Sequence, residues 1–195
     1  MKKASLDPFE LKSYRSVSNL SFTSKLIERL AVNRFNQHIS TNQLLPDCQS
    51  AYRRHHSTET AIAIVINNIA RTIDSGKVCA LVLLDLSAAF DTVDHRILTE
   101  VLKRRFAVEG TALEWFESYF SGRTQTFYVA DASSRPVPLI CGVPQGSILG
   151  PTVFVAYTEE IQTSLTLVYH LYADDTQLLA CCPVFFIDIC RHSIE

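Results

Sequence analysis

Apolar residues recur at helical spacing in two long segments of the first half of the chain. In the segment near 24–39 these residues are Leu26, Leu30 and Phe35. In the segment 58–75 five of them form one stripe on the helix surface: Ile62, Val65, Ile66, Ile69 and Ile73. Such a stripe is the face that a helix packs against a core, so we predict a helix in each segment.

Strand-length apolar runs and helical segments alternate along the rest of the chain. The run from Val78 to Leu84 is continuous, which is typical of a strand buried on both faces. Two further runs, 165–171 and 178–182, also have strand length and enclose a polar turn. Other helices and strands are predicted at five segments: helices near 94–106, 111–121 and 151–162, and hairpin strands near 124–130 and 136–141. This order predicts an α+β fold with helices on one face of an antiparallel sheet.

The turn between the last two apolar runs has the sequence Tyr172-Ala173-Asp174-Asp175. Successive side chains of a strand point to opposite faces, so two adjacent aspartates converge only where the chain bends. We therefore predict a hairpin that presents two carboxylates at its tip, a candidate site for hard cations such as Mg²⁺. Because Asp is common in turns, an ordinary solvated turn is the alternative interpretation.

A third aspartate, Asp85, closes the apolar run that begins at Val78. A carboxylate at the end of a buried strand costs free energy unless a cation or hydrogen-bond donors compensate it. If this strand lies beside the acidic turn, three carboxylates can hold two Mg²⁺ ions for an in-line phosphoryl displacement. Alternatively, Asp85 caps a helix that starts at Leu86 or Ser87, and one residue can serve both roles.

The segment 141–151 is rich in glycine and proline. Gly142, Gly146 and Gly150 permit a ligand to approach the backbone closely, and Gln145 can both donate and accept hydrogen bonds. The segment has neither the Gly-Lys-Ser/Thr ending nor the G-x-G-x-x-G pattern of common phosphate-binding loops. Although it could be a plain connector, its position between the two acidic strands favours a role in ligand binding.

The composition agrees with one sizeable core, or a core with a small appended lobe, since 47% of the 195 residues are hydrophobic. No apolar signal segment follows the N-terminus, and no apolar run is long enough to span a bilayer. The six cysteines lack the spacing of zinc sites. We therefore expect an intracellular protein with reduced, buried thiols and no membrane partner.

Charge is distributed unevenly along the chain, although the net charge is only −2. Residues 1–60 carry nine Lys and Arg against five Asp and Glu, whereas residues 131–195 carry two against seven. Basic clusters at 53–56 and 103–105 suit binding to a phosphate backbone. A solvated surface is the alternative, because positive residues are common at the C-terminal end of a helix.

The Asp85 segment, the glycine-rich segment and the acidic turn occur in this order in one family. The chain resembles the reverse transcriptase domain of non-LTR, LINE-type retrotransposons over residues 5–180. Other segments that carry the resemblance are Tyr14–Ser21, Leu45–Arg53, His56–Ala61, Trp115–Phe116 and Ser121–Arg123. The resemblance implies a right-hand polymerase with partial fingers at 1–75, a palm at 76–180 and a divergent tail at 181–195. We expect a copy truncated after the acidic turn, with the thumb absent.

The resemblance also implies a role for each candidate residue. Asp85 and Asp174 would be the principal ligands of Mg²⁺, or of Mn²⁺, and Asp175 would be a weaker or outer partner. The remaining candidates would contact the nucleotide or the template: Phe90, Gln145, Gly146 and Arg53. For Phe90 the alternative is an ordinary core residue, and Arg54 is the neighbouring choice for the arginine.

The implied activity is RNA-directed DNA polymerisation, with an RNA template, a DNA primer and deoxynucleoside triphosphates as partners. The alternative is a catalytically inactive remnant that binds nucleic acid weakly, because a partial hand offers fewer phosphate contacts. A metal-dependent nuclease could use the same carboxylates, but the sequence lacks a His or Lys pattern for activating water.

Overall fold

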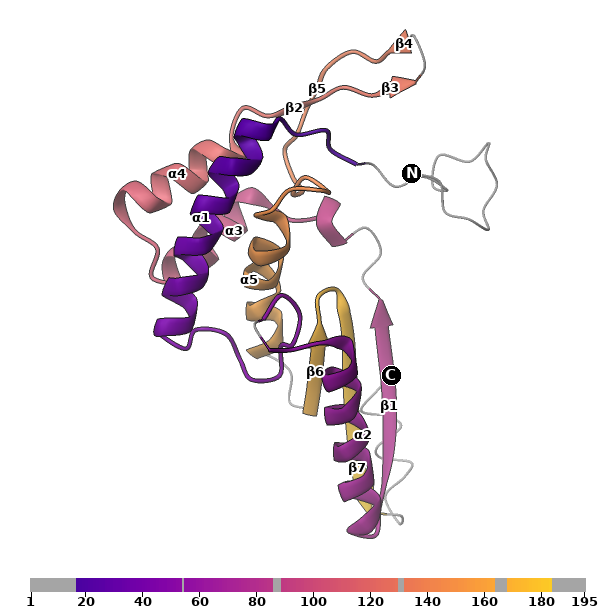
Figure 1. Ribbon diagram of the computed structural model, residues 1–195. Coiled ribbons are helices and arrows are strands. Elements are labelled where there is room, and N and C mark those ends of the chain that lie inside the picture. The colour runs from indigo at the N-terminus through magenta and orange to yellow at the C-terminus, as the bar shows by residue number, and fades with distance from the viewer. Residues whose placement is uncertain (1–16, 54, 86–88, 130–131, 164–167, 184–195) are drawn as a thin grey trace. The chain divides into compact units, whose positions relative to one another are not determined.

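The computed structural model describes residues 17–53, 55–85, 89–129, 132–163 and 168–183. Two compact units make up the chain (Figure 1). We call Met1–Asn42 with Phe90–Tyr157 the helical unit, and Gln43–Ala89 with Thr158–Glu195 the sheet unit. Each unit combines separate stretches of sequence, so the expected division into fingers, palm and tail stays a prediction.

The helical unit is built around helices that the apolar periodicity predicted. It contains α1 (Phe22–Thr41), α3 (His95–Arg104), α4 (Gly110–Phe120) and the beginning of α5 (Gly150–Thr163). Two of these helices have side-chain caps: Ser21 accepts from the backbone of Ser24 in α1, and Asp94 accepts from two amides of α3.

Aromatic rings form much of the core of this unit. The Phe35 ring lies 5.8 Å from the Phe106 ring and 5.5 Å from the Phe116 ring, centroid to centroid. Phe106, Leu98 and Leu102 are fully buried. Burial of such large apolar side chains is the main force that holds α1 to α3 and α4.

The hairpin predicted at 124–141 is present, but its ladders are short. The observed pairs are β2 (Thr124–Gln125) with β5 (Val137–Pro138), and β3 (Tyr128–Val129) with β4 (Ala132–Ser133). Pro136 and Pro138 have no backbone N–H to donate, which limits pairing along the second half of the hairpin.

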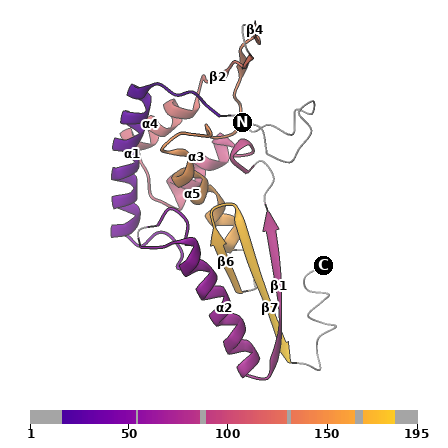
Figure 2. The same cartoon turned by 45° about the vertical axis from the view of Figure 1, so that its right-hand side comes forward.

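The sheet unit contains one antiparallel sheet with the strand order β1-β7-β6. Its strands are β1 (Lys77–Asp85), β6 (Val168–Tyr172) and β7 (Asp175–Pro183). Helix α2 (Thr58–Asp74) lies along this sheet in both views (Figures 1 and 2). A capping box between Ser57 and Thr60 begins the helix. The predicted mixture of helices and antiparallel strands is therefore confirmed.

The prediction that the Val78–Leu84 strand is buried on both faces is wrong. Leu81 is 43% exposed, Leu83 68% and Leu84 46%. β1 is an edge strand of the sheet, and helix α2, which packs against the sheet, leaves these side chains of β1 uncovered. A continuous apolar run reports strand length and composition, but not how many faces are covered.

The apolar stripe predicted on the second helix is also largely exposed. Within the stripe, Ile62 is 54% exposed, Ile66 60% and Ile73 60%, whereas Val65 is buried; Ala61, outside the stripe, is buried too. The buried face of the helix is therefore narrower than the stripe and includes the small side chain of Ala61. Thr72 on the same side donates its hydroxyl to the carbonyl of Asn68, 2.8 Å away, so this polar group is satisfied.

The described cysteines are thiols and form no disulfide with one another: Cys48, Cys79, Cys141, Cys181 and Cys182. The expectation that they are buried is wrong for Cys141 and Cys181, which are exposed. Cys190 lies outside the described residues. In the described part of the chain, no helix has both the length and the apolar character needed to cross a membrane.

Candidate active site

The acidic turn is the tip of the hairpin between β6 and β7. Tyr172 pairs with Asp175 in the ladder, so Ala173 and Asp174 form a two-residue turn. Ala173 has a φ of 58°, the left-handed conformation that tight hairpin turns require. The bend inferred from the two adjacent aspartates is therefore present, with Asp174 in the turn and Asp175 as the first residue of β7.

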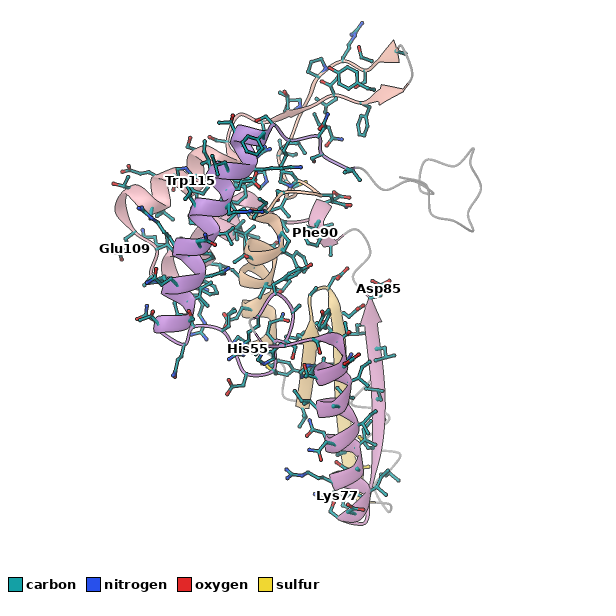
Figure 3. The ribbon with its side chains drawn as sticks, viewed as in Figure 1. His55, Lys77, Asp85, Phe90, Glu109 and Trp115 are labelled. Atoms are coloured by element: carbon teal, nitrogen blue, oxygen red, sulfur yellow. The ribbon has the colours of Figure 1, made fainter. Side chains whose placement is uncertain are left out.

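Asp85 lies directly beside this turn. It is the last residue of β1, and its partner across the ladder is Asp175 (Figure 3 labels Asp85). Opposed residues of an antiparallel pair have Cα atoms about 4.5–5.5 Å apart. The ladder thus brings Asp85 next to Asp174 and Asp175. The N-cap alternative for Asp85 concerns residues 86–88, which lie outside the described residues.

The Asp175 carboxyl is influenced electrostatically by the other two carboxylates. Burial raises the pKa of Asp175, and the negative charges of Asp174 and Asp85 raise it further. Like charges this close favour a bound cation, and carboxylate oxygens are the ligands that Mg²⁺ and Mn²⁺ prefer. Within the described ranges, however, no three His, Cys, Asp or Glu side chains converge as a ready metal-binding group. The donor set fits such an ion chemically, and the side chains would have to turn toward one another to hold it.

Arg53 also belongs to the sheet unit, but its guanidinium is engaged locally. It donates to the carbonyl oxygen of Pro46 at 3.1 Å and pairs with Asp47 at 3.4 Å. The Arg53 side chain is 31% exposed, so it remains within reach of solvent. Arg54 lies outside the described residues.

Tyr52, next to Arg53, shares the electrostatic environment of the acidic turn. Burial raises the pKa of the Tyr52 hydroxyl, and the charge of Asp174 raises it further. Tyr52 as a whole is still 56% exposed, and its backbone has a φ of 55°. The sequence singled out Arg53 and not Tyr52, because a tyrosine in a polar segment carries no particular signal.

A short segment before Arg53 extends the pairing at β6. Ser50 donates its N–H to the carbonyl of Leu171 at 2.9 Å, and Leu171 donates to the carbonyl of Cys48 at 2.8 Å. The Ser50 hydroxyl lies 3.0 Å from Nε2 of His170, and both residues are buried. Burial lowers the pKa of His170, and the nearby His56 lowers it further. The parallel bridge between Gln49 and Leu171 anchors the strand that leads into the acidic turn. Sequence periodicity could not reveal this bridge because the segment is polar.

In the helical unit, Phe90 and the glycine-rich segment lie together. The Phe90 ring (labelled in Figure 3) stacks on Phe154 of α5, with centroids 4.9 Å apart. Its carbonyl accepts from the N–H of Val143 at 2.7 Å. Gly142 has a φ of 88°, and a Cβ there would lie 3.1 Å from the backbone of Asp91. Close approach by another backbone, rather than by a ligand, thus accounts for this glycine.

Gln145 and Gly146 form the turn that precedes α5. The Gln145 carbonyl accepts from the N–H of Ser18 at 2.8 Å, and Gly146 has a φ of 98°. Ser147 then accepts from the N–H of Gly150 at 2.7 Å, at the start of α5. Pro151 follows in the first turn of this helix, which the sequence predicts near 151–162.

The carboxylate of Glu28 holds this turn through hydrogen bonds, a role that the sequence did not indicate. One carboxyl oxygen accepts from the hydroxyl of Tyr119 at 2.8 Å, and the other accepts from the N–H of Ile148 at 2.7 Å. Glu28 is only 1% exposed, so these bonds join α1, α4 and the glycine-rich segment in the interior. A glutamate in a helical segment with many polar residues is normally expected on the surface, so its sequence context gives no sign of such a role.

The Glu28–Tyr119 bond predicts a stability change at alkaline pH. Burial, and then Glu28, raise the pKa of Tyr119 from 10.0 to about 12. The folded chain therefore holds this proton more tightly than the unfolded chain, and the associated stability is complete below pH 10 and is lost as the pH rises toward 12. We expect urea unfolding midpoints to fall less steeply over this interval in Tyr119→Phe than in the wild type. Equal slopes would contradict the assigned bond.

The sequence-predicted residues thus lie in two groups. The sheet unit holds Asp85, Asp174 and Asp175 around one hairpin tip, together with Arg53, whereas the helical unit holds Phe90, Gln145 and Gly146. In the sheet unit the chain brings distant segments together, since Asp85 and Asp174 are 89 positions apart in the sequence.

Comparison with known proteins finds similarity to one class of protein, RNA-directed DNA polymerases of mobile elements. A family model described as reverse transcriptase (RNA-dependent DNA polymerase) matches residues 1–184. A probable RNA-directed DNA polymerase from transposon BS of Drosophila melanogaster is 34% identical over 86% of this chain, and the match spans 19% of that protein. The RNA-directed DNA polymerase from mobile element jockey of the same species is 29% identical over 91% of this chain and 20% of its own length. A probable RNA-directed DNA polymerase from transposon X-element, again of this species, is 32% identical over 78% of this chain. The chain spans about a fifth of the length of the first two relatives.

Proposed function

This chain belongs to the reverse transcriptase (RNA-dependent DNA polymerase) family, and on that premise we propose that it is the part of a retrotransposon polymerase that carries out nucleotidyl transfer. The observation that supports the proposal is the pairing of Asp85 with Asp175 beside the turn that carries Asp174. We further propose that the sheet unit is part of a polymerase palm.

Asp85 and Asp174 would hold divalent metal ions, Mg²⁺ or Mn²⁺, with Asp175 as a weaker partner. Such ions, when bound, favour deprotonation of the primer 3′-hydroxyl and neutralise charge on the departing pyrophosphate. The raised pKa of Asp175 supports its lesser role, because a carboxylate that is harder to ionise is a poorer ligand.

Arg53 would bind the triphosphate, since a guanidinium suits phosphate oxygens. In this structure Arg53 pairs with Asp47, so a triphosphate would replace one anionic partner with another. Gln145 and Gly146 would line the nucleotide and the template strand. Their turn is held by Glu28 through Ile148, which would keep the backbone in a fixed position.

Phe90 would exclude ribonucleotides, because an aromatic ring under the incoming sugar leaves no room for a 2′-hydroxyl. We expect Phe90→Ala to lower the preference for deoxynucleotides over ribonucleotides by about 10-fold or more. The ratio of the two incorporation rates does not depend on the amount of folded enzyme. An unchanged ratio would assign Phe90 to the core alone, through its stacking on Phe154.

Primer extension on an RNA template tests the proposal. The purified chain is incubated with a DNA primer and deoxynucleoside triphosphates, with Mg²⁺ and Mn²⁺ in parallel. We expect extension in at least one metal. Failure in both, from protein shown to be folded by circular dichroism, would favour the alternative function, a catalytically inactive chain that binds nucleic acid weakly.

A further inference from the structure

Two cysteines face each other across the β1–β7 ladder. Cys79 is the register partner of Cys181, and their Sγ atoms lie 3.3 Å apart. Opposed residues in an antiparallel ladder have Cα atoms about 4.5–5.5 Å apart, within the range that a disulfide spans. The two sulfur atoms therefore need to move by little more than an ångström to reach a bonding distance of about 2 Å.

The pair is also placed to react with solutes. Cys181 is exposed and Cys79 is partly exposed, on the edge strand β1 and its neighbour β7. The Thr72 hydroxyl lies 3.5 Å from Sγ of Cys181, near enough to hydrogen-bond with the sulfur. Cys182, the next residue, pairs with Val78 instead and has no cysteine opposite it in the ladder.

We propose that Cys79 and Cys181 form a reversible disulfide when the protein meets a mild two-electron oxidant such as hydrogen peroxide. The Cys181 thiolate attacks one peroxide oxygen, the O–O bond breaks, and a sulfenic acid and hydroxide result. The Cys79 thiolate then attacks the sulfenic sulfur, the S–O bond breaks, and a second hydroxide leaves as the Sγ–Sγ bond forms. The peroxide gains two electrons and the two thiols lose them; the protons released by the thiols convert both hydroxides to water.

The disulfide would fasten the sheet in the register that the candidate active site uses. The ladder that pairs Cys79 with Cys181 also pairs Asp85 with Asp175, and the two pairs are six residues apart on each strand. The two cysteines are 102 positions apart, so the bond would close a long loop and restrict the unfolded chain strongly. We expect oxidation to raise the midpoint of thermal unfolding by roughly 5–15 °C without reductant, and dithiothreitol to reverse the change.

Peptide mapping after treatment with stoichiometric hydrogen peroxide tests the proposal. The wild type should lose about 2 Da in intact mass and yield one linked peptide that joins Cys79 to Cys181. Cys79→Ser and Cys181→Ser should lose both the linkage and the thermal shift, while Cys182→Ser should keep them. Because the linkage is read in the wild type, a variant that fails to fold does not obscure the result. Over-oxidised Cys181 without a linked peptide, or linkage through Cys182 or between molecules, would overturn the proposal.

Discussion

Replacing Asp174 by alanine should abolish primer extension, with a fall in rate on the order of 10³-fold or more. Asp174 occupies the turn between β6 and β7, beside Asp85 and Asp175. Its removal takes away a proposed principal ligand of the divalent ion, and the two remaining carboxylates cannot replace it. Backbone groups make the ladder between β6 and β7, so the fold should be retained.

The control for this substitution is Asp74→Ala, at the end of α2 in the same unit. This substitution removes one exposed negative charge that lies away from the hairpin tip. It should leave the rate of primer extension within about 2-fold of the wild type. If Asp174→Ala extends primers as well as Asp74→Ala does, the hairpin carboxylates are not the catalytic ligands.

Glu28→Ala should lower the free energy of unfolding by roughly 2–4 kcal/mol. The change leaves the Tyr119 hydroxyl and the Ile148 N–H without their buried acceptor, and it removes a side chain that is only 1% exposed. Urea denaturation measures the loss. Glu28→Gln, which keeps one acceptor oxygen and nearly the same volume, should lose less.

Glu114→Ala provides the matched control for Glu28→Ala, because Glu114 lies on the exposed side of α4. It should change stability by no more than about 0.5 kcal/mol. Equal losses for the two alanine variants would show that Glu28 does not hold the glycine-rich segment in place.

The acidic hairpin could be predicted because local rules decide it. Two adjacent aspartates between apolar strands specify a bend, and Ala173 at positive φ supplies it. The helices were predictable for a similar reason, since periodicity and caps such as Ser57 are local properties.

Burial of the sheet could not be predicted from the same patterns. Leu83 lies in a continuous apolar run, yet it is exposed, because β1 is at the sheet edge. On α2, Ala61 rather than Ile62 is buried, since the orientation of a helix depends on the surface that it packs against. The roles of Glu28 and Ser50 depend on partners more than 90 residues away, Tyr119 and His170, which no local pattern encodes.

Direct measurement of Mn²⁺ binding tests the central claim, that the β6–β7 hairpin tip and Asp85 form a metal-dependent active site. Binding is monitored as the loss of the free Mn²⁺ signal in electron paramagnetic resonance. The proteins compared are the wild type, Asp85→Asn, Asp174→Asn and the control Asp74→Asn. We predict binding by the wild type and by Asp74→Asn, and affinities weaker by roughly 10-fold or more in the other two variants. Equal binding by all four proteins, or no binding by the folded wild type, would contradict the assignment.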